Sequence, residues 1–149
     1  MSKSWILNWA RESDQVTDLY IYDYISHEKS YDRDKGTPGP EVTAQEIVDQ
    51  LAGITTPEIV VHINSGGGDA TEGMAIAQAL KDARGKGKRI SCQVDGLCAS
   101  AAVNVALACS PVRIPRNAYM MIHDPACVQV GLFTASEMRK SADQLDAVK

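Results

Sequence analysis

Short runs rich in β-branched and aromatic residues alternate along this chain with segments of helical spacing. Such runs favour strands, and we expect strands over residues 18–25, 57–64, 89–94 and 119–122. After them we expect helices over residues 43–53, 69–85, 101–109 and 134–149. A strand followed each time by a helix predicts an α/β fold in which right-handed crossovers build a largely parallel sheet.

Three capping-box patterns mark the starts of predicted helices, with a small polar residue three positions before an acidic one. They are Thr43–Glu46, Asp69–Glu72 and Thr134–Glu137. The mostly apolar run 57–64 is typical of a strand covered on both faces. The charged segment 26–40, which has Gly and Pro near its end, is expected to be a surface loop.

The length of 149 residues suits one domain with a substantial core, so we expect a single domain over residues 1–149. Residues 1–16 carry Trp5 and Trp9 and are expected to form an N-terminal strand, or an arm that packs on another subunit.

Charge and cysteine spacing exclude several classes of function. The net charge of −4 argues against a nucleic-acid partner, and the basic run 84–89 is interpreted as a helix end and turn. The chain has neither C-x-x-C nor H-E-x-x-H, so we expect no metal and no cofactor. The cysteines are expected to be reduced, and neither a leader nor a membrane span is found, which predicts a soluble cytoplasmic protein.

Residues suited to chemistry follow three of the predicted strands. They are the segment 64–69, the segment 96–100 and His123. Sites in parallel sheets gather beyond the carboxyl ends of the strands. We therefore expect the three segments to meet.

Ser100 stands where a strand ends and a helix begins. It is either a capping serine in a seam of small residues or a nucleophile whose oxyanion meets the free N–H groups of the helix start. His123 is either a hydrogen-bonded structural residue or a base. His27 and His62 are interpreted as structural, and Cys98 as a packing residue.

The three glycines at 66–68 allow three interpretations. They could cradle a phosphate, form a turn that needs positive φ, or present a backbone N–H to a reacting carbonyl in an oxyanion hole. The chain has no G-x-x-x-x-G-K-[ST] and lacks the third glycine of the dinucleotide fingerprint, which counts against the phosphate cradle.

Three sequence blocks together carry a resemblance to a known family. The blocks are Ile63–Gly68, Gly96–Ala101 and Met121–Pro125, and they resemble the signature blocks of the Clp protease proteolytic subunit (ClpP) in order and spacing. More narrowly, the chain is similar to the ClpP-like head maturation proteases of phages and prophages, from about Asp18 to its end. The resemblance implies the ClpP/crotonase-like spiral of βα units.

The resemblance also implies roles for individual residues. Ser100 matches the nucleophile, and His123 matches the general base that takes its proton and later gives it to the leaving amine. Gly67 and Ala101 match the residues whose backbone N–H groups form the oxyanion hole. Gly68 would shape the bed of the substrate strand.

The chain departs from the family pattern at three points. Gly66 stands where the family usually has proline, and Asp124 where an uncharged amide is common. The third triad residue of the family is an aspartate beyond residue 149, and nothing places Asp143 or Asp146 near the imidazole. We therefore expect a domain that is incomplete at its C-terminus, with residues 126–149 as a handle-like region, or a family member that works with a dyad.

Partners follow from the resemblance as well. The family forms rings, often stacked, that cleave polypeptides. Clp proteases work with an AAA+ unfoldase, while the phage relatives act on scaffold and capsid proteins. Because this chain has no P-loop, we expect the ATP-independent core of a serine endopeptidase, with a role in phage capsid or scaffold maturation and with no nucleic-acid or membrane partner.

Other functions stay open. The absent triad acid favours a catalytically silent ring subunit or a truncated prophage remnant. A crotonase-fold acyl-CoA enzyme shares the spiral fold, but it needs catalytic acids rather than the Ser100 and His123 pair. A Ser/Lys peptidase needs a lysine base, and the block around His123 speaks against it.

Overall fold

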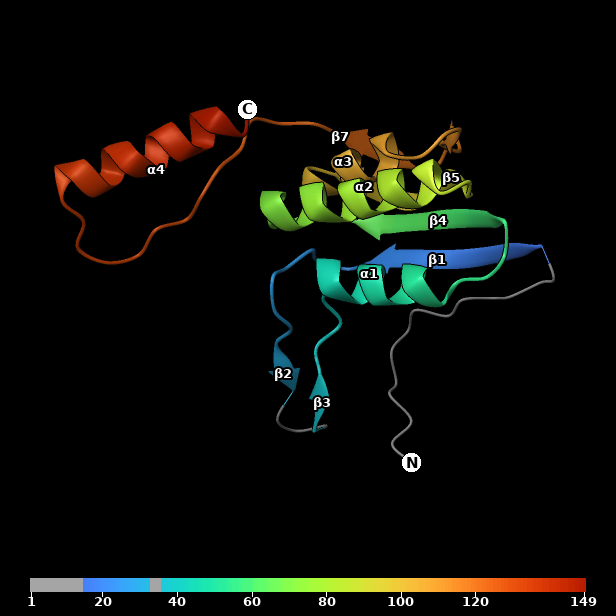
Figure 1. The fold of residues 1–149 in the computed structure, drawn as a ribbon. Coiled ribbons are helices and arrows are strands. Elements are labelled where there is room, and N and C mark those ends of the chain that lie inside the picture. Colours follow the sequence, from blue (N-terminus) through green and yellow to red (C-terminus); the bar gives the residue numbers. More distant parts are fainter. Residues whose placement is uncertain (1–14, 33–35) are drawn as a thin grey trace.

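A computed structural model describes residues 15–32 and 36–149 of the chain, and Figure 1 shows its fold. The strands are β1 (Val16–Tyr22), β2 (Tyr31–Asp32), β3 (Thr37–Pro38), β4 (Glu58–Ser65), β5 (Arg89–Ala99), β6 (Val112–Arg113) and β7 (Tyr119–Met121). The helices are α1 (Ala44–Gly53), α2 (Ala70–Gly85), α3 (Ala101–Leu107) and α4 (Ala135–Ala147). The arm or strand expected over residues 1–16 lies outside the described residues except for its last two.

One parallel sheet is built from five of these strands. Their order is β1-β4-β5-β6, and β7 also pairs with β5. β4 lies along one edge of β5, while β6 and β7 share the other edge, beside Cys92–Gln93 and Leu97–Ala99 respectively. Every pair in this sheet is parallel, so the predicted α/β fold with a largely parallel sheet is confirmed.

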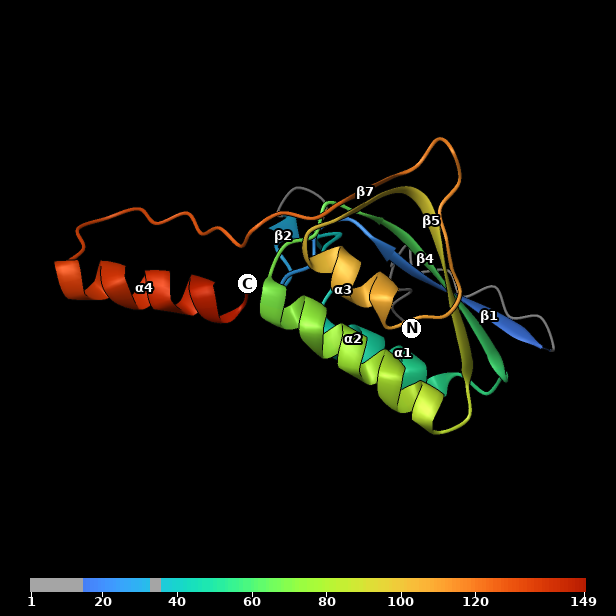
Figure 2. The same cartoon turned by 90° about the horizontal axis from the view of Figure 1, so that it is seen from above.

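The core lies between this sheet and three helices. α1, α2 and α3 cover one face, as Figure 2 shows. Successive side chains of a strand point to opposite faces, so alternate residues of β1, β4 and β5 are buried beneath the helices: Leu19, Ile21, Ile59, Val61, Ile63, Ile90, Cys92 and Val94. Burial of one such aliphatic side chain stabilises the fold by roughly 1.5–3 kcal/mol.

The other face of the sheet differs from the prediction for β4. The run 57–64 predicts cover on both faces, but no described helix lies on the second face, and the side chains of β4 there are only partly buried. His62 Nδ1 lies 2.8 Å from Asp95 Oδ2, the Tyr22 hydroxyl donates to the same oxygen at 2.7 Å, and Tyr20 stacks on the imidazole. The second face is therefore polar and aromatic rather than aliphatic.

The tyrosine of this cluster is held in its protonated form. Burial, reinforced by the hydrogen bond to Asp95, raises the pKa of Tyr22 to about 12. Its hydroxyl therefore donates to Asp95 throughout the neutral range. This bond ties β1 to β5 one residue before Gly96.

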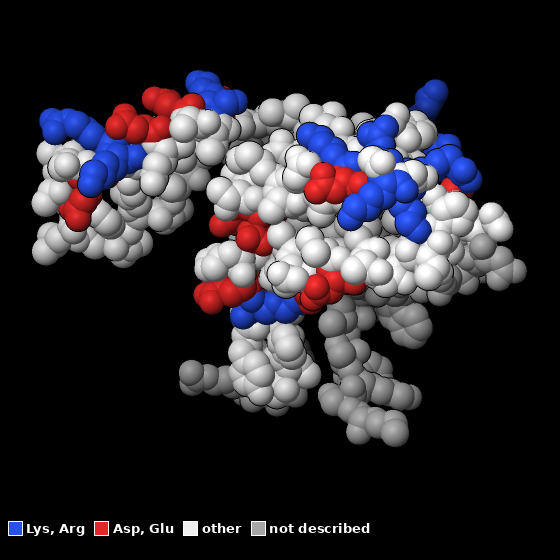
Figure 3. All heavy atoms as spheres, in the orientation of Figure 1, with Lys and Arg blue, Asp and Glu red and all other residues white. Residues whose placement is uncertain are grey.

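The basic run 84–89 forms a helix end and turn, as its sequence predicts. Figure 3 shows Lys and Arg side chains gathered over the end of α2. Lys88 Nζ donates to the carbonyl oxygens of Ile54 and Thr56 at 2.9 and 2.6 Å, and an Arg84 nitrogen donates to the Ala108 carbonyl at 3.0 Å. These cations bind carbonyl groups of the chain itself.

A short hairpin occupies part of the segment that the sequence predicts as a plain loop. β2 and β3 pair antiparallel, with Tyr31 opposite Pro38, and the hairpin extends away from the sheet in Figure 1. Its base is tied to α1 by an ion pair between Lys29 and Glu46 at 2.9 Å. Pairs of two-residue strands carry too short an alternation to be seen in a sequence.

The last helix lies apart from the sheet and from the other helices in both views (Figures 1 and 2), and none of its residues is buried. Its predicted capping box, Thr134–Glu137, is formed, as is Thr43–Glu46 at the start of α1. In the stretch before α4, Val128, Val130 and Leu132 are almost wholly exposed. Within the described ranges, no helix combines the length and apolar character that crossing a membrane requires.

α2 and α3 approach each other closely at one glycine. A Cβ added to Gly73 would lie 2.8 Å from the Ala101 carbonyl oxygen and 2.9 Å from the Ala101 Cβ. Gly85, at the other end of α2, has nothing within 4 Å of such a Cβ. The absence of a side chain at Gly73 therefore allows the first turn of α3 to lie close against α2.

We expect Gly73→Ala to lower the free energy of unfolding by about 1–3 kcal/mol, because the added methyl group overpacks the contact with Ala101. The matched control, Gly85→Ala, should raise stability by roughly 0.5–1 kcal/mol, because alanine is the better helix former and meets no neighbour. Urea unfolding followed by circular dichroism measures both. Equal effects of the two variants would contradict the close approach of α2 to α3.

Candidate active site

Ser100 joins β5 to α3 in a conformation that few residues adopt. Its φ and ψ are 54° and −126°, and its side chain makes no capping hydrogen bond to α3. Such a conformation costs on the order of 1–3 kcal/mol and is concentrated at functional sites. The structure therefore does not support the interpretation of Ser100 as a helix cap.

The glycine turn after β4 packs directly against this junction. Gly67 has φ +92°, and a Cβ placed on it would lie 2.5 Å from the Ala99 carbonyl oxygen and 2.7 Å from the Ser100 Cβ. The Ala101 nitrogen is 2.9 Å from the same point. Gly67 is thus required both for its backbone conformation and for its approach to Ser100.

Ala101 begins α3 and is buried. Its backbone N–H has no partner within the helix, because the first turn of a helix has no preceding carbonyl groups to bind. The structure therefore brings Ser100, Gly67 and Ala101 together. Three residues from two separate strand ends meet where the sequence predicts a site.

The N–H of Gly67 is already engaged. It donates to the Ser65 hydroxyl at 3.1 Å, and this buried hydroxyl donates to the Asp23 carbonyl at 2.5 Å. Sequence reasoning gave Ser65 no role of its own. The available signal was a hydroxyl two residues before the glycine, within reach of its backbone N–H.

Gly68 lies beside a neighbouring segment of the chain rather than in open space. Gly67 accepts a hydrogen bond from the Ile25 N–H, and the Asp69 N–H donates to the Ile25 carbonyl, each at 2.8 Å. The Cβ of any larger residue at 68 would overlap that carbonyl. One side of Gly68 is therefore occupied by Ile25.

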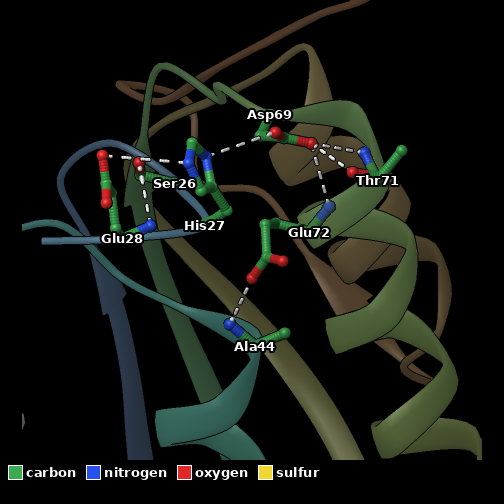
Figure 4. Close-up of polar contacts among 7 residues, drawn as sticks. All are labelled: Ser26, His27, Glu28, Ala44, Asp69, Thr71 and Glu72. Atoms are coloured by element: carbon green, nitrogen blue, oxygen red, sulfur yellow. Dashed lines mark hydrogen bonds and ion pairs between the residues drawn. The ribbon is translucent and has the colours of Figure 1, made fainter.

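Asp69 caps α2 and fixes the end of the glycine turn (Figure 4). Its carboxylate accepts from the Thr71 and Glu72 N–H groups at 2.8 and 3.2 Å and from the Thr71 hydroxyl at 2.6 Å. The hydroxyl and these N–H groups lower the pKa of Asp69. Glu72 does not return a bond to Asp69 but accepts from the Ala44 N–H at 2.8 Å, so the capping box predicted for Asp69–Glu72 is only half formed.

His27 lies at the rim of this turn (Figure 4). Its Nδ1 is 3.9 Å from Asp69 Oδ2, and its Nε2 is 3.9 Å from Glu28 Oε1. Its side chain is 69% exposed, so these long contacts contribute little to stability.

β7 carries His123 alongside the nucleophile position. Met121 pairs with Ala99, and the Ser100 N–H donates to the Met121 carbonyl at 2.9 Å. His123 follows two residues later and its ring is exposed, with Nδ1 2.6 Å from the Asp124 carbonyl oxygen. The Ser100 backbone is therefore bonded to the residue two positions before His123, but no hydrogen bond joins the described side chains of Ser100 and His123.

No described carboxylate hydrogen-bonds to His123. Lys149 binds the Asp124 side chain at 2.9 Å. Asp143 and Asp146 are exposed on α4, which lies apart from the sheet in Figures 1 and 2.

The described ranges contain no cluster of three or more residues suited to a metal ion. Cys98 is buried beside the junction, and burial raises its pKa to about 12. This thiol therefore stays protonated at neutral pH and is a poor nucleophile.

Comparisons with known proteins identify the family and the fold of the chain. The sequence model of the Clp protease family matches residues 35–149. No curated protein matches the chain. Among solved structures, a ClpP1 mutant from Listeria monocytogenes superposes with a TM-score of 0.57 at 21% sequence identity, covering 88% of this chain and 64% of that one. This chain thus spans less than two thirds of the length of that relative, and the likeness establishes the fold.

We expect Gly67→Ala to lower the free energy of unfolding by about 1–3 kcal/mol, because the methyl group would overlap the Ala99–Ser100 backbone and φ is positive. The control is the adjacent Gly66→Ala, where a Cβ meets nothing within 4 Å and φ is not positive. Chemical denaturation measures both. A Gly66→Ala variant as unstable as Gly67→Ala would contradict the specific contact with Ser100.

Proposed function

The chain belongs to the Clp protease family, and from this premise we propose that it is a serine-type endopeptidase with Ser100 as nucleophile. The observation that carries the proposal is the conformation of Ser100. It has positive φ, does not cap its helix, and packs against Gly67 at the meeting point of two strand ends.

In the proposed reaction, Ser100 Oγ attacks the scissile carbonyl while His123 Nε2 takes the hydroxyl proton. The tetrahedral oxyanion accepts hydrogen bonds from the backbone N–H groups of Ala101 and Gly67. His123 then gives the proton to the leaving amine, and water hydrolyses the acyl-enzyme by the same steps. The exposed His123 ring must turn toward Ser100, as catalytic hydrogen bonds often form only in the substrate complex.

The oxyanion hole requires a rearrangement at Gly67. Its N–H donates to the Ser65 hydroxyl, so it must be shared with the oxyanion or turned toward it. One such donor is worth about 2.7–4 kcal/mol in the transition state. Gly68 would then border the bound polypeptide on the side that Ile25 does not occupy.

We extend the proposal to a role in phage capsid or scaffold maturation, with action in the cytoplasm and an AAA+ unfoldase as the other candidate partner. The sequence similarity from about Asp18 to the end of the chain supports the phage relatives. The buried free thiols of Cys92, Cys98 and Cys109 fit a reducing compartment.

A catalytically silent ring subunit is the second candidate. Two observations favour it: His123 is not bonded to Ser100, and the N–H of Gly67 is engaged by Ser65. An acyl-CoA enzyme has less support, because no described carboxylate bonds to His123 or Ser100.

We expect a fluorophosphonate probe to add one label to the protein, read by intact mass, because an activated serine attacks phosphorus readily. Ser100→Ala should abolish labelling, and His123→Ala should slow it on the order of 10²–10⁴-fold. Ser91→Ala, on the same strand but outside the site, serves as the matched control. A folded parent protein that stays unlabelled would favour the silent subunit.

We also expect the chain to assemble with copies of itself through the exposed apolar residues around β7 and the stretch before α4. Tyr119, Ile122, Val130 and Leu132 are each at least three-quarters exposed, and large apolar side chains that lie together on a surface mark interfaces. Light scattering should show an oligomer that Leu132→Glu dissociates, whereas Lys81→Glu on α2 leaves it intact. A monomer at all concentrations would contradict the ring proposal.

A further inference from the structure

We infer that Asn64 is a positioning residue, whose side-chain carbonyl fills a bulge in β5 and so sets the register that brings Ser100 to Gly67. Asn64 lies in the first of the three sequence blocks but takes no part in the proposed reaction. The catalytic meaning of the inference rests on the proposed function. The contact itself can be measured without activity.

β4 and β5 fall out of register just before the site. Ile63 pairs with Val94, and the next pair joins Ser65 to Cys98. β5 therefore uses four residues where β4 uses two, and the surplus forms a bulge over residues 95–97. Bulges beside active sites change the direction of the residues that follow them. Ser100 follows this bulge after the short stretch of β5 that pairs with β7.

The Asn64 side chain reaches into this bulge from β4. The Leu97 N–H donates to Asn64 Oδ1 at 3.1 Å. A Cβ added to Gly96 would lie 2.7 Å from the same oxygen and would meet only the Asn64 side chain within 4 Å. Leu97 stands opposite no residue of the β4 ladder, so a side-chain carbonyl satisfies its N–H where a backbone carbonyl does not.

The main chain of Asn64 is fixed independently of this bond. Its carbonyl accepts from the Asp23 N–H at 3.1 Å, and the hydroxyl of the next residue, Ser65, donates to the Asp23 carbonyl at 2.5 Å. Asn64 is exposed, so core packing does not hold its side chain in place. The side chain thus joins the fixed end of β4 to the bulge of β5.

Beyond the bulge, β5 carries the nucleophile position directly. Leu97 pairs with Tyr119 of β7, and the Ser100 N–H donates to the Met121 carbonyl at 2.9 Å. Loss of the Asn64 acceptor would free the bulge to change the register of this stretch. The distance from Ser100 to Gly67 therefore depends on a side chain that touches neither of them.

Amide hydrogen exchange, followed by NMR on the isotope-labelled full chain, tests the contact without activity. We expect Asn64→Ala to speed exchange of the Leu97 N–H roughly 2- to 10-fold, because a hydrogen bond is lost, and to speed exchange of the Ser100 N–H with it. Asn64→Asp keeps an acceptor oxygen at this exposed position and should leave both amides at the parent rate. Asn104→Ala, at an exposed position on α3, is the matched control. Unchanged exchange of either amide in Asn64→Ala would overturn the inference.

A double-variant cycle tests whether the Asn64 oxygen fills the bulge. In the parent protein, Gly96→Ala should speed exchange of the Leu97 N–H as Asn64→Ala does, because the new methyl group displaces Oδ1. In the Asn64→Ala background the same methyl group meets no neighbour within 4 Å, so it should add nothing. Additive effects of the two changes would overturn the inference.

Labelling with the fluorophosphonate relates the contact to the reaction. We expect Asn64→Ala and Gly96→Ala each to slow labelling of Ser100 on the order of 10²-fold, which is the effect of a small misplacement of a reacting group. Asn64→Asp should label at the parent rate, a rescue that follows the acceptor oxygen rather than the amide group. Labelling of Asn64→Ala at the parent rate would overturn the positioning role.

The inference and the proposed function fail separately in these experiments. A parent protein that stays unlabelled, while exchange of Leu97 and Ser100 responds to Asn64→Ala as expected, would keep the inference and lose the proposed peptidase function. A protein that labels at Ser100 equally fast with and without the Asn64 side chain would do the reverse.

Discussion

The contact between the Gly67 backbone and the Ala99–Ala101 segment is the constraint on which the rest of the structure depends. It requires positive φ at Gly67 and at Ser100, because no ordinary side chain or conformation fits between the two strand ends. Ser65 and Ile25 bind the glycine turn with hydrogen bonds. On the other side of the contact, Gly73 allows α2 to pack against Ala101. The strain at Ser100 is sustained by these contacts rather than by local preference.

The sequence predicts the architecture well because each helix and core strand repeats its pattern over many residues. α2 and the aliphatic faces of β4 and β5 follow directly from such periodicity. Two predictions fail because of partners that are distant along the chain. The second face of β4 carries a contact between His62 and Asp95 instead of a helix, and Glu72 bonds to Ala44 instead of its own cap. The β2–β3 hairpin is missed for another reason, since it has no periodic signal.

The candidate site also has features that the sequence predicts and features that it does not. That Ser100, Gly67 and Ala101 meet follows from the rule that strand ends of a parallel sheet share one edge. The direction of a single peptide N–H or of an imidazole ring does not follow from that rule, because only a few local contacts determine it. The Gly67 N–H donates to the Ser65 hydroxyl, and His123 Nδ1 lies against the Asp124 carbonyl oxygen. The sequence blocks therefore predict where the site lies, but not whether its hydrogen-bond donor and its base are oriented for catalysis.

The double pairing of β5 restricts how this chain can vary in length. β6 is aligned with Cys92–Gln93 and β7 with Leu97–Ala99 on a single continuous strand. Between these stretches the pairing of β5 with β4 shifts register, from Ile63–Val94 to Ser65–Cys98. A change in the number of residues there alters the register that brings Ser100 to Gly67. The hairpin and α4 lie outside this ladder, whereas the spacing from Cys92 to Ser100 is set by it.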